Sequence, residues 1–256
     1  PVLSADGAEA FFLRDDGLTS EVCRAAWEDG KMGEIAVIAS SARSKRGLKA
    51  SPCGRKIAWL EATGDLVVAA LGGAAAKVVA QSWDSPTYDW SPCGERLVMA
   101  AKDIHSNRDI FLVSADGSQQ PLNLTQHPAF EGSPKFSPDG KRIVFTAKRE
   151  PDGIARLWLI DVGGTGKPPS DPRPMETDIG EPTRVVWAAD SRSLLFQSRD
   201  KSDATIYSVP ADGGEVKEFA GFRGTAEGMG ADGCSFWRID RVPAVFREGV
   251  VTRFAF

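Results

Sequence analysis

Residues suited to acid–base or metal chemistry are scarce in this chain. Its 256 residues include only two histidines and four cysteines. The sequence has no Cys-x-x-Cys pair, no histidine cluster and no Gly-x-Ser-x-Gly nucleophile motif, which argues against a structural zinc site and an esterase-type nucleophile. We therefore expect no catalytic residue, no metal and no cofactor within this chain.

Long apolar runs and an excess of one charge are also lacking. No stretch approaches the roughly 18 apolar residues of a membrane-spanning helix, and no basic leader precedes an apolar segment. Lys and Arg number 31 against 35 Asp and Glu, for a net charge of −4. Nucleic-acid binding calls for broad basic surfaces, whereas the single basic cluster here, Arg43–Arg46, is expected to be a solvated loop. We expect neither a nucleic-acid partner nor a membrane span.

What the sequence does contain is a repeat. A short string with Ser or another small residue first, Asp or Cys third and usually Gly fourth returns six times, beginning at Ser4, Ser51, Ser91, Ser137, Ala188 and Gly230. The fourth residues are Gly7, Gly54, Gly94, Gly140, Ser191 and Gly233, so the string recurs every 40 to 51 residues. A period of this size is typical of one four-stranded propeller blade.

Strand patterns surround each copy. The third residue after the turn is Ala10, Ile57, Leu97, Ile143, Leu194 or Phe236, and the fifth is mostly large and apolar, which places one face of a second strand inward. Third strands rich in β-branched and aromatic residues follow at 109–113, 156–160 and 205–209. Fourth strands are weaker, the best candidates being 77–81, 120–125 and 215–220.

These patterns predict an all-β protein, a six-bladed β-propeller with four antiparallel strands in each blade and no obvious strand-exchange closure. One domain spans 1–256, with blades at about 1–43, 44–83, 84–129, 130–180, 181–223 and 224–256. The chain begins with Pro1 inside an expected strand. We expect it to be a fragment of a longer protein.

Three motifs receive a structural interpretation. Cys53 and Cys93 occupy the same position in successive turns, too far apart for a disulfide, and are expected to be free thiols in place of Asp. His105 and His127 lie in expected loops without partners for catalysis. The glycine-rich segment 163–167 departs from the phosphate-loop spacing and is interpreted as a turn.

One constellation is defined by position alone. If the strand before each turn lines a central channel, the residues on or near its inner rim are Lys49, Asp89, Lys135, Arg184 and Glu227. They would give a tunnel of mixed charge that contacts peptide. The alternative is that they are polar simply because they face water.

The repeats resemble a known family. The segments Tyr88–Gly94, Asn107–Gly117, Asn123–Pro128 and Phe136–Ile143 are similar to the propeller repeats of tricorn-type proteases, to those of TolB and to the related Pro-Asp repeats called WD40-like. The resemblance covers the whole chain as a repeat and is strongest from Tyr88 to Val162. Six blades favour the tricorn amino-terminal propeller or TolB over the oligopeptidase propellers. The Cys turns and Ser191 depart from the repeat consensus.

The tricorn resemblance implies a non-catalytic propeller that gates or docks peptides for a larger serine peptidase, whose other domains would be its partners. That interpretation favours a cytoplasmic location. The TolB alternative implies a protein-docking scaffold in the periplasm. A third alternative is a standalone propeller enzyme with a channel metal, for which Asp89 and Glu227 are the only obvious carboxylates on the inner strands.

Overall fold

The computed structural model describes residues 1–4, 6–73, 75–82, 84–102, 107–163, 168–177, 180–198, 205–229, 235–239, 242–247 and 250–253. From residue 219 onward, only the backbone is described. These residues form 23 strands and no helix. The chain divides into two compact units, Pro1–Asn123 and Leu124–Phe256.

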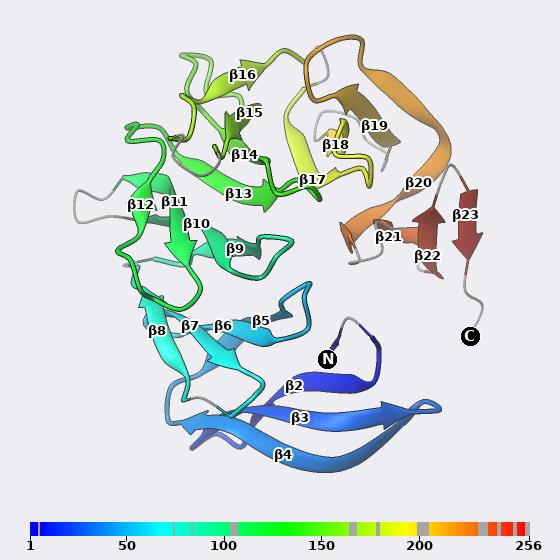
Figure 1. Ribbon diagram of the computed structural model, residues 1–256. Coiled ribbons are helices and arrows are strands. Elements are labelled where there is room, and N and C mark those ends of the chain that lie inside the picture. Colours follow the sequence, from blue (N-terminus) through cyan, green and yellow to red (C-terminus); the bar gives the residue numbers. More distant parts are fainter. Residues whose placement is uncertain are drawn as a thin grey trace. The chain divides into compact units, whose positions relative to one another are not determined.

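The first unit contains three four-stranded antiparallel sheets, each made of consecutive strands (Figure 1). The strands are β1 (Val2–Leu3), β2 (Glu9–Asp15), β3 (Ser20–Glu28) and β4 (Lys31–Ser41); β5 (Lys45–Ala50), β6 (Lys56–Glu61), β7 (Leu66–Ala70) and β8 (Lys77–Ala80); β9 (Thr87–Trp90), β10 (Arg96–Lys102), β11 (Arg108–Ser114) and β12 (Leu122–Asn123).

The second unit contains one four-stranded and one seven-stranded sheet, again antiparallel and in sequence order. The strands are β13 (Glu131–Phe136), β14 (Arg142–Ala147), β15 (Arg156–Asp161) and β16 (Arg173–Met175); β17 (Pro182–Trp187), β18 (Ser193–Ser198), β19 (Thr205–Pro210), β20 (Lys217–Met229), β21 (Ser235–Ile239), β22 (Val242–Arg247) and β23 (Val250–Arg253).

The seven-stranded sheet is two four-stranded units that share β20. Residues 217–223 of this strand pair with β19, and residues 224–229 pair with β21. Figure 1 shows β20 as one continuous orange strand between these neighbours. The sequence suggested an outer strand at 215–220 and a separate inner strand for the next repeat. No proline lies between Ala220 and Met229, so no fixed φ interrupts the strand there.

The repeated string forms the turn between the first and second strands. In four sheets the Gly N–H donates to the carbonyl of the first Ser: Gly7 to Ser4 (2.9 Å), Gly54 to Ser51 (2.9 Å), Gly94 to Ser91 (2.9 Å) and Gly140 to Ser137 (2.8 Å). The φ of these glycines is 70° to 72°, a conformation that carries little cost without a Cβ. Ser191 adopts φ 58° at the same place, so the turn keeps its geometry without glycine.

Apolar residues alternate between two buried faces of the inner sheets. On β6, Ile57 and Trp59 pack with Phe11 and Val22 of the first sheet, whereas Ala58 and Leu60 pack with residues of the third. The sequence pattern pointed to one inward face, and the structure buries both faces of β6 because the β5–β8 sheet is covered by the first sheet on one side and the third sheet on the other. This stacking, together with the strand order, is that of a six-bladed β-propeller with four antiparallel strands in each blade.

The basic cluster at Arg43–Arg46 is a solvated loop only in part, because Arg43 and Ser44 are exposed between strands whereas Lys45 is buried. Lys45 begins β5 and is only 6% exposed. Its ammonium donates to the Ser20 carbonyl (2.8 Å), the Ser41 hydroxyl (2.6 Å) and the Arg43 carbonyl (3.0 Å). Three acceptors compensate the loss of water around the buried charge, so Lys45 ties the first two sheets together.

Candidate functional site

Three innermost strands carry a β-bulge at the same repeat position. The register shifts in β5, β13 and β17, and the bulged residue has a left-handed φ: 63° at Gly47, 53° at Ser133 and 50° at Arg184. A bulge of this kind re-aims the local side chain and strengthens the twist. In the second unit, the bulge therefore determines where Ser133 and Arg184 project.

Both of these residues line a pocket of about 450 Å³ between the fourth and fifth sheets. One wall comes from the β13–β14 sheet and includes Phe130, Ser133, Lys135, Thr146 and Lys148. The opposite wall comes from the start of β17 and includes Glu181, Thr183 and Arg184. The volume lies within the range of ligand-binding clefts.

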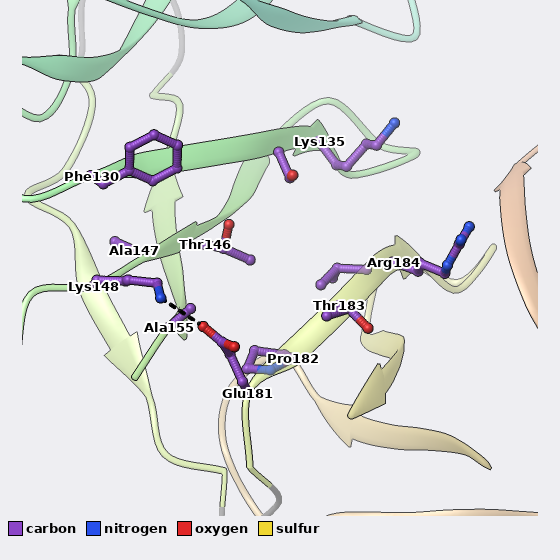
Figure 2. A pocket seen from close by; sticks show the side chains of 12 residues that line it. Phe130, Lys135, Thr146, Ala147, Lys148, Ala155, Glu181, Pro182, Thr183 and Arg184 are labelled. Atoms are coloured by element: carbon purple, nitrogen blue, oxygen red, sulfur yellow. Dashed lines mark ion pairs between the residues drawn. The ribbon is translucent and has the colours of Figure 1, made fainter. Parts of the chain in front are cut away.

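The charges in the pocket are unevenly distributed. Lys148 and Glu181 form an ion pair of 3.0 Å across it, with the carboxylate the less exposed partner. Figure 2 shows Lys135 and Arg184 extending at the end of the pocket away from this pair. Glu181 is the one carboxylate among the lining residues, against three cationic side chains. The pocket is thus locally positive although the chain carries a net charge of −4.

Threonine hydroxyls hold the backbone around the pocket. Thr146 Oγ1 donates to the Gly132 carbonyl (3.1 Å) beside the β13 bulge, and Thr183 Oγ1 donates to the Gln197 carbonyl (3.3 Å) beside the β17 bulge. Each hydroxyl reaches a carbonyl of the adjacent strand near the point where the register shifts.

A buried ion pair supports the floor of the β13 wall. Glu131 is fully buried, and Arg149 donates to its Oε1 through Nε (2.9 Å) and Nη2 (2.5 Å). The guanidinium also stacks over the Trp158 ring, with 4.3 Å between the guanidinium carbon and the ring centroid. This buried charge pair fixes the position of Glu131, at the start of β13, and of Arg149, which directly follows Lys148.

The two sheets are joined at the other end of the inner strands, near the turns. Trp187 Nε1 donates to the Lys135 carbonyl (3.2 Å), and the Asp139 N–H donates to the Ser191 hydroxyl (3.0 Å). Arg142 bonds both the Ser191 carbonyl and Asp212. These contacts anchor one end of the two inner strands, so the walls of the pocket are held in place.

The structure brings together two pairs of the residues expected at the inner rim. Lys135 and Arg184 share the pocket. In the first unit, Lys49 donates to Asp89 Oδ1 (3.3 Å) and to the Tyr88 carbonyl (2.6 Å). The charges of Lys49 and Asp89 therefore neutralise one another. The side chain of Glu227 lies outside the described residues. That all five line one channel stays a prediction.

Sequence reasoning missed Lys148, Glu181 and the two threonines. Glu181 directly precedes β17, and Lys148 directly follows β14. Both lie at the end of their sheet opposite the turns, where no repeated string marks them. Counting back from the turn along the inner strand places Glu181 at the same repeat position as Phe130, and both residues line the pocket. This shared position is the signal that could have identified Glu181.

The thiols and histidines are placed as follows. Cys53 and Cys93 are free, as predicted, and so is buried Cys23. His127 Nδ1 accepts a hydrogen bond from the Ala129 N–H (3.1 Å), a loop-stabilising contact. His105 and residues 164–167 lie outside the described residues.

Two other kinds of feature are absent from the described part of the chain. No group of three or more His, Cys, Asp or Glu side chains there is placed to hold a metal ion. The same residues include no helix with the length and apolar character to cross a bilayer.

Comparison by sequence finds partial matches to a peptidase. No protein-family model matches the chain. Dipeptidyl-peptidase 5 of Trichophyton schoenleinii is 31% identical over 151 residues, which cover 50% of this chain and 20% of that protein. The chain thus corresponds to about a fifth of the length of the curated relatives that it matches.

Comparison by structure finds propellers. The tricorn protease aligns with a TM-score of 0.73 and 11% identity over 96% of this chain and 29% of its own. TolB from Acinetobacter baumannii aligns with a TM-score of 0.62 and 16% identity over 94% of this chain and 61% of its own. An oligogalacturonate lyase in complex with manganese aligns with a TM-score of 0.69 and 17% identity over 98% of this chain and 75% of its own. The chain is a six-bladed β-propeller of the kind found in TolB and the tricorn protease.

Proposed function

We propose that this chain is a non-catalytic propeller that gates or docks peptides for a larger serine peptidase of the tricorn type. The observation that carries the proposal is the positive pocket beside two inner strands, in a fold shared with the tricorn protease. The partial match to dipeptidyl-peptidase 5 supports an association with peptide cleavage.

The open edges of the inner strands suit this role. β13 and β17 each lie at the end of their sheet and pair with one neighbouring strand. The other edge carries backbone N–H and C=O groups, the groups with which an extended peptide pairs by strand addition. A folded protein presents few such groups, so an unfolded peptide is the ligand that this surface favours.

The proposal assigns peptide contacts to Lys49, Asp89, Lys135, Arg184 and Glu227, and treats residues 1–256 as one propeller domain of a longer chain. Lys135 and Arg184 have the strongest support because they lie in one pocket. Lys49 and Asp89 form an ion pair that a peptide would have to share or open.

A second function is a docking scaffold of the TolB type, favoured by the alignment with TolB over 94% of this chain. It would use an outer rim rather than the inner strands. Pull-down with a variant whose pocket is filled distinguishes the two functions, because a docked folded partner is retained and a threaded peptide is lost.

The test of gating uses the full-length protein that carries this chain. Lys135→Trp fills the pocket, and we expect cleavage of long peptides to slow several-fold while cleavage of a dipeptide reporter is unchanged. Lys141→Trp, an exposed position beside the turn of the same sheet, is the matched control. Equal slowing of both substrates, or of neither, would contradict gating.

A further inference from the structure

Two thiols occupy neighbouring turns of the first unit, at the place where another turn carries aspartate. In the turn of the fourth sheet, the Asp139 carboxylate accepts hydrogen bonds from the Ser137 hydroxyl (2.6 Å) and the Lys141 N–H (3.1 Å). Such a turn is a small anion site, because a hydroxyl and a backbone N–H point at one atom. Cys53 and Cys93 take the same place in the second and third sheets, so the turn geometry there favours a thiolate.

Cys93 is the more accessible of the two turn thiols. It is exposed, and its sulfur contacts the Ser91 hydroxyl at 3.4 Å. Cys53 is half-buried, and its sulfur lies against Gly94 of the neighbouring sheet, where an added Cβ would have no room. A small molecule from solution therefore reaches Cys93 more readily than Cys53.

Arg55 lies close to both sulfurs. Its pKa is raised, first by a hydrogen bond to the Cys53 sulfur and then by the charges of Cys53, Glu95 and Cys93. The guanidinium also donates to Glu95 Oε1 (3.1 Å), and its side chain is 69% exposed. Lys56 bonds the other oxygen of this carboxylate at 2.8 Å. Cys53 and Glu95 thus hold an exposed guanidinium beside the Cys93 thiol.

A third cation acts on Cys93. Burial acts to raise the pKa of this thiol, but hydrogen bonds and the charge of Arg96 outweigh it and lower the pKa below its ordinary value. Three cationic side chains therefore lie around the turn thiols, against the carboxylates of Glu95 and Asp116. This charge balance favours an anionic reaction partner over a neutral one.

We propose that Cys93 is a site of mixed-disulfide formation with small anionic disulfides, with Arg55 binding the anionic group of the incoming molecule and Cys53 holding Arg55 in place. The Cys93 thiolate attacks one sulfur of the disulfide, so a new S–S bond joins Cys93 to that half and the original S–S bond breaks. The other half leaves as a thiolate and takes up a proton from water. The protein thiol is oxidised and the leaving half is reduced. A carboxylate is the anionic group that a guanidinium binds through two parallel hydrogen bonds.

The test compares two disulfides on the full 256-residue chain: oxidised glutathione, which carries carboxylates, and bis(2-hydroxyethyl) disulfide, which is neutral. Timed quenching and peptide mapping give the rate at each cysteine. We expect oxidised glutathione to modify Cys93 about tenfold or more faster than buried Cys23, because exchange needs both a thiolate and access to it. Equal rates at these two cysteines would overturn the proposal.

The preference for an anion is the ratio of the two probes' rates at Cys93, divided by the same ratio in urea-denatured protein. We expect this ratio to be several-fold above one. Arg55→Gln should bring it close to one, and Arg55→Lys should keep part of it. Arg192→Gln is the matched control, since Arg192 has the same repeat position in the fifth sheet and is also exposed. It should leave the ratio unchanged.

The role of Cys53 is tested by two substitutions. Cys53→Asp keeps an anionic acceptor for Arg55 and should retain the ratio, whereas Cys53→Ala removes the acceptor and should reduce it. A ratio of one in the unaltered chain would overturn recognition of an anionic disulfide. A ratio that Arg55→Gln leaves unchanged would overturn the role of Arg55.

Discussion

Serine hydroxyls at the first position of the repeated turn accept a hydrogen bond from the residue that begins the second strand. Ser51, Ser91 and Ser137 accept from the N–H of Lys56, Arg96 and Arg142 at 2.9 to 3.0 Å. The third turn residue also contacts this hydroxyl, as a carboxylate at Asp139 (2.6 Å) and as sulfur at Cys53 and Cys93 (3.4 Å each). Cysteine thus takes the place of aspartate in the hydrogen-bond network of the turn.

This substitution makes the two turn thiols acidic. Burial acts to raise the pKa of Cys53 and Cys93, but hydrogen bonds from the neighbouring serine and the backbone outweigh it, so both pKa values lie below the ordinary one. Burial raises the pKa of Cys23. The thiolate is the reactive form of cysteine, and a thiol with a lower pKa forms the thiolate at lower pH.

We expect exposed Cys93 to be alkylated by iodoacetamide at a lower pH than Cys23, with the largest difference in thiolate fraction at a pH between the two pKa values. Peptide mapping after timed labelling assigns the rates to individual cysteines. Ser91→Ala removes one donor to the Cys93 sulfur and should raise the pH at which labelling begins. A rate for Cys93 that follows the profile of a free thiol in a denatured sample would contradict the account.

We expect the buried ion pair at the start of β13 to contribute more to the free energy of unfolding than ion pairs on the surface of the sheets. Arg149→Met leaves the buried Glu131 carboxylate without its guanidinium, and we expect this to lower the free energy of unfolding by about 3 kcal/mol or more. Urea denaturation measures the change. Arg156→Met breaks the pair with Asp152, whose side chains are 33% and 41% exposed, and should cost less than about 1 kcal/mol.

The double variant Glu131→Gln, Arg149→Met removes both charges together. It should recover much of the stability lost in Arg149→Met, because no unpaired charge stays buried. Equal losses in the double and single variants would show that packing of Arg149 on Trp158, and not charge, supports this strand.

The bulge in β17 makes a separate prediction about strain. Arg184→Gly relaxes the left-handed conformation but increases the freedom of the unfolded chain, so we expect a net gain of about 0.5 kcal/mol. Arg192→Gly, where φ is not left-handed, should destabilise the chain instead. Thermal unfolding of both variants decides this. A clear loss of stability in Arg184→Gly would mean that the arginine side chain stabilises the fold.

Much of the architecture follows from the spacing of the turns. The Ser-x-Asp/Cys-Gly strings and the alternating residues after them predicted the second and third strands because turn chemistry and side-chain direction are local properties. The bulges at Ser133 and Arg184 were not predictable, since neither residue is a typical left-handed one. The partners of Lys148 and Lys45 depend on how neighbouring sheets stack, which no local pattern encodes.

Considered as a whole molecule, the chain combines an overall negative charge with a local positive pocket. The net charge of the chain therefore gives no general attraction for an anionic ligand, and the proposed peptide contacts depend on the local charges of the pocket. The chain matches 20% of the length of dipeptidyl-peptidase 5 and aligns with 29% of the tricorn protease chain, so the proposed function places catalysis in other domains.

The central claim is that this propeller binds unfolded peptide. The most direct measurement is a fluorescence anisotropy titration of a labelled, unstructured peptide with the purified 256-residue chain, with unlabelled peptide and a folded protein as competitors. The account predicts saturable binding that unlabelled peptide displaces, that the folded protein does not displace, and that weakens with added salt. An unchanged anisotropy across the titration, or displacement by the folded competitor alone, would contradict it.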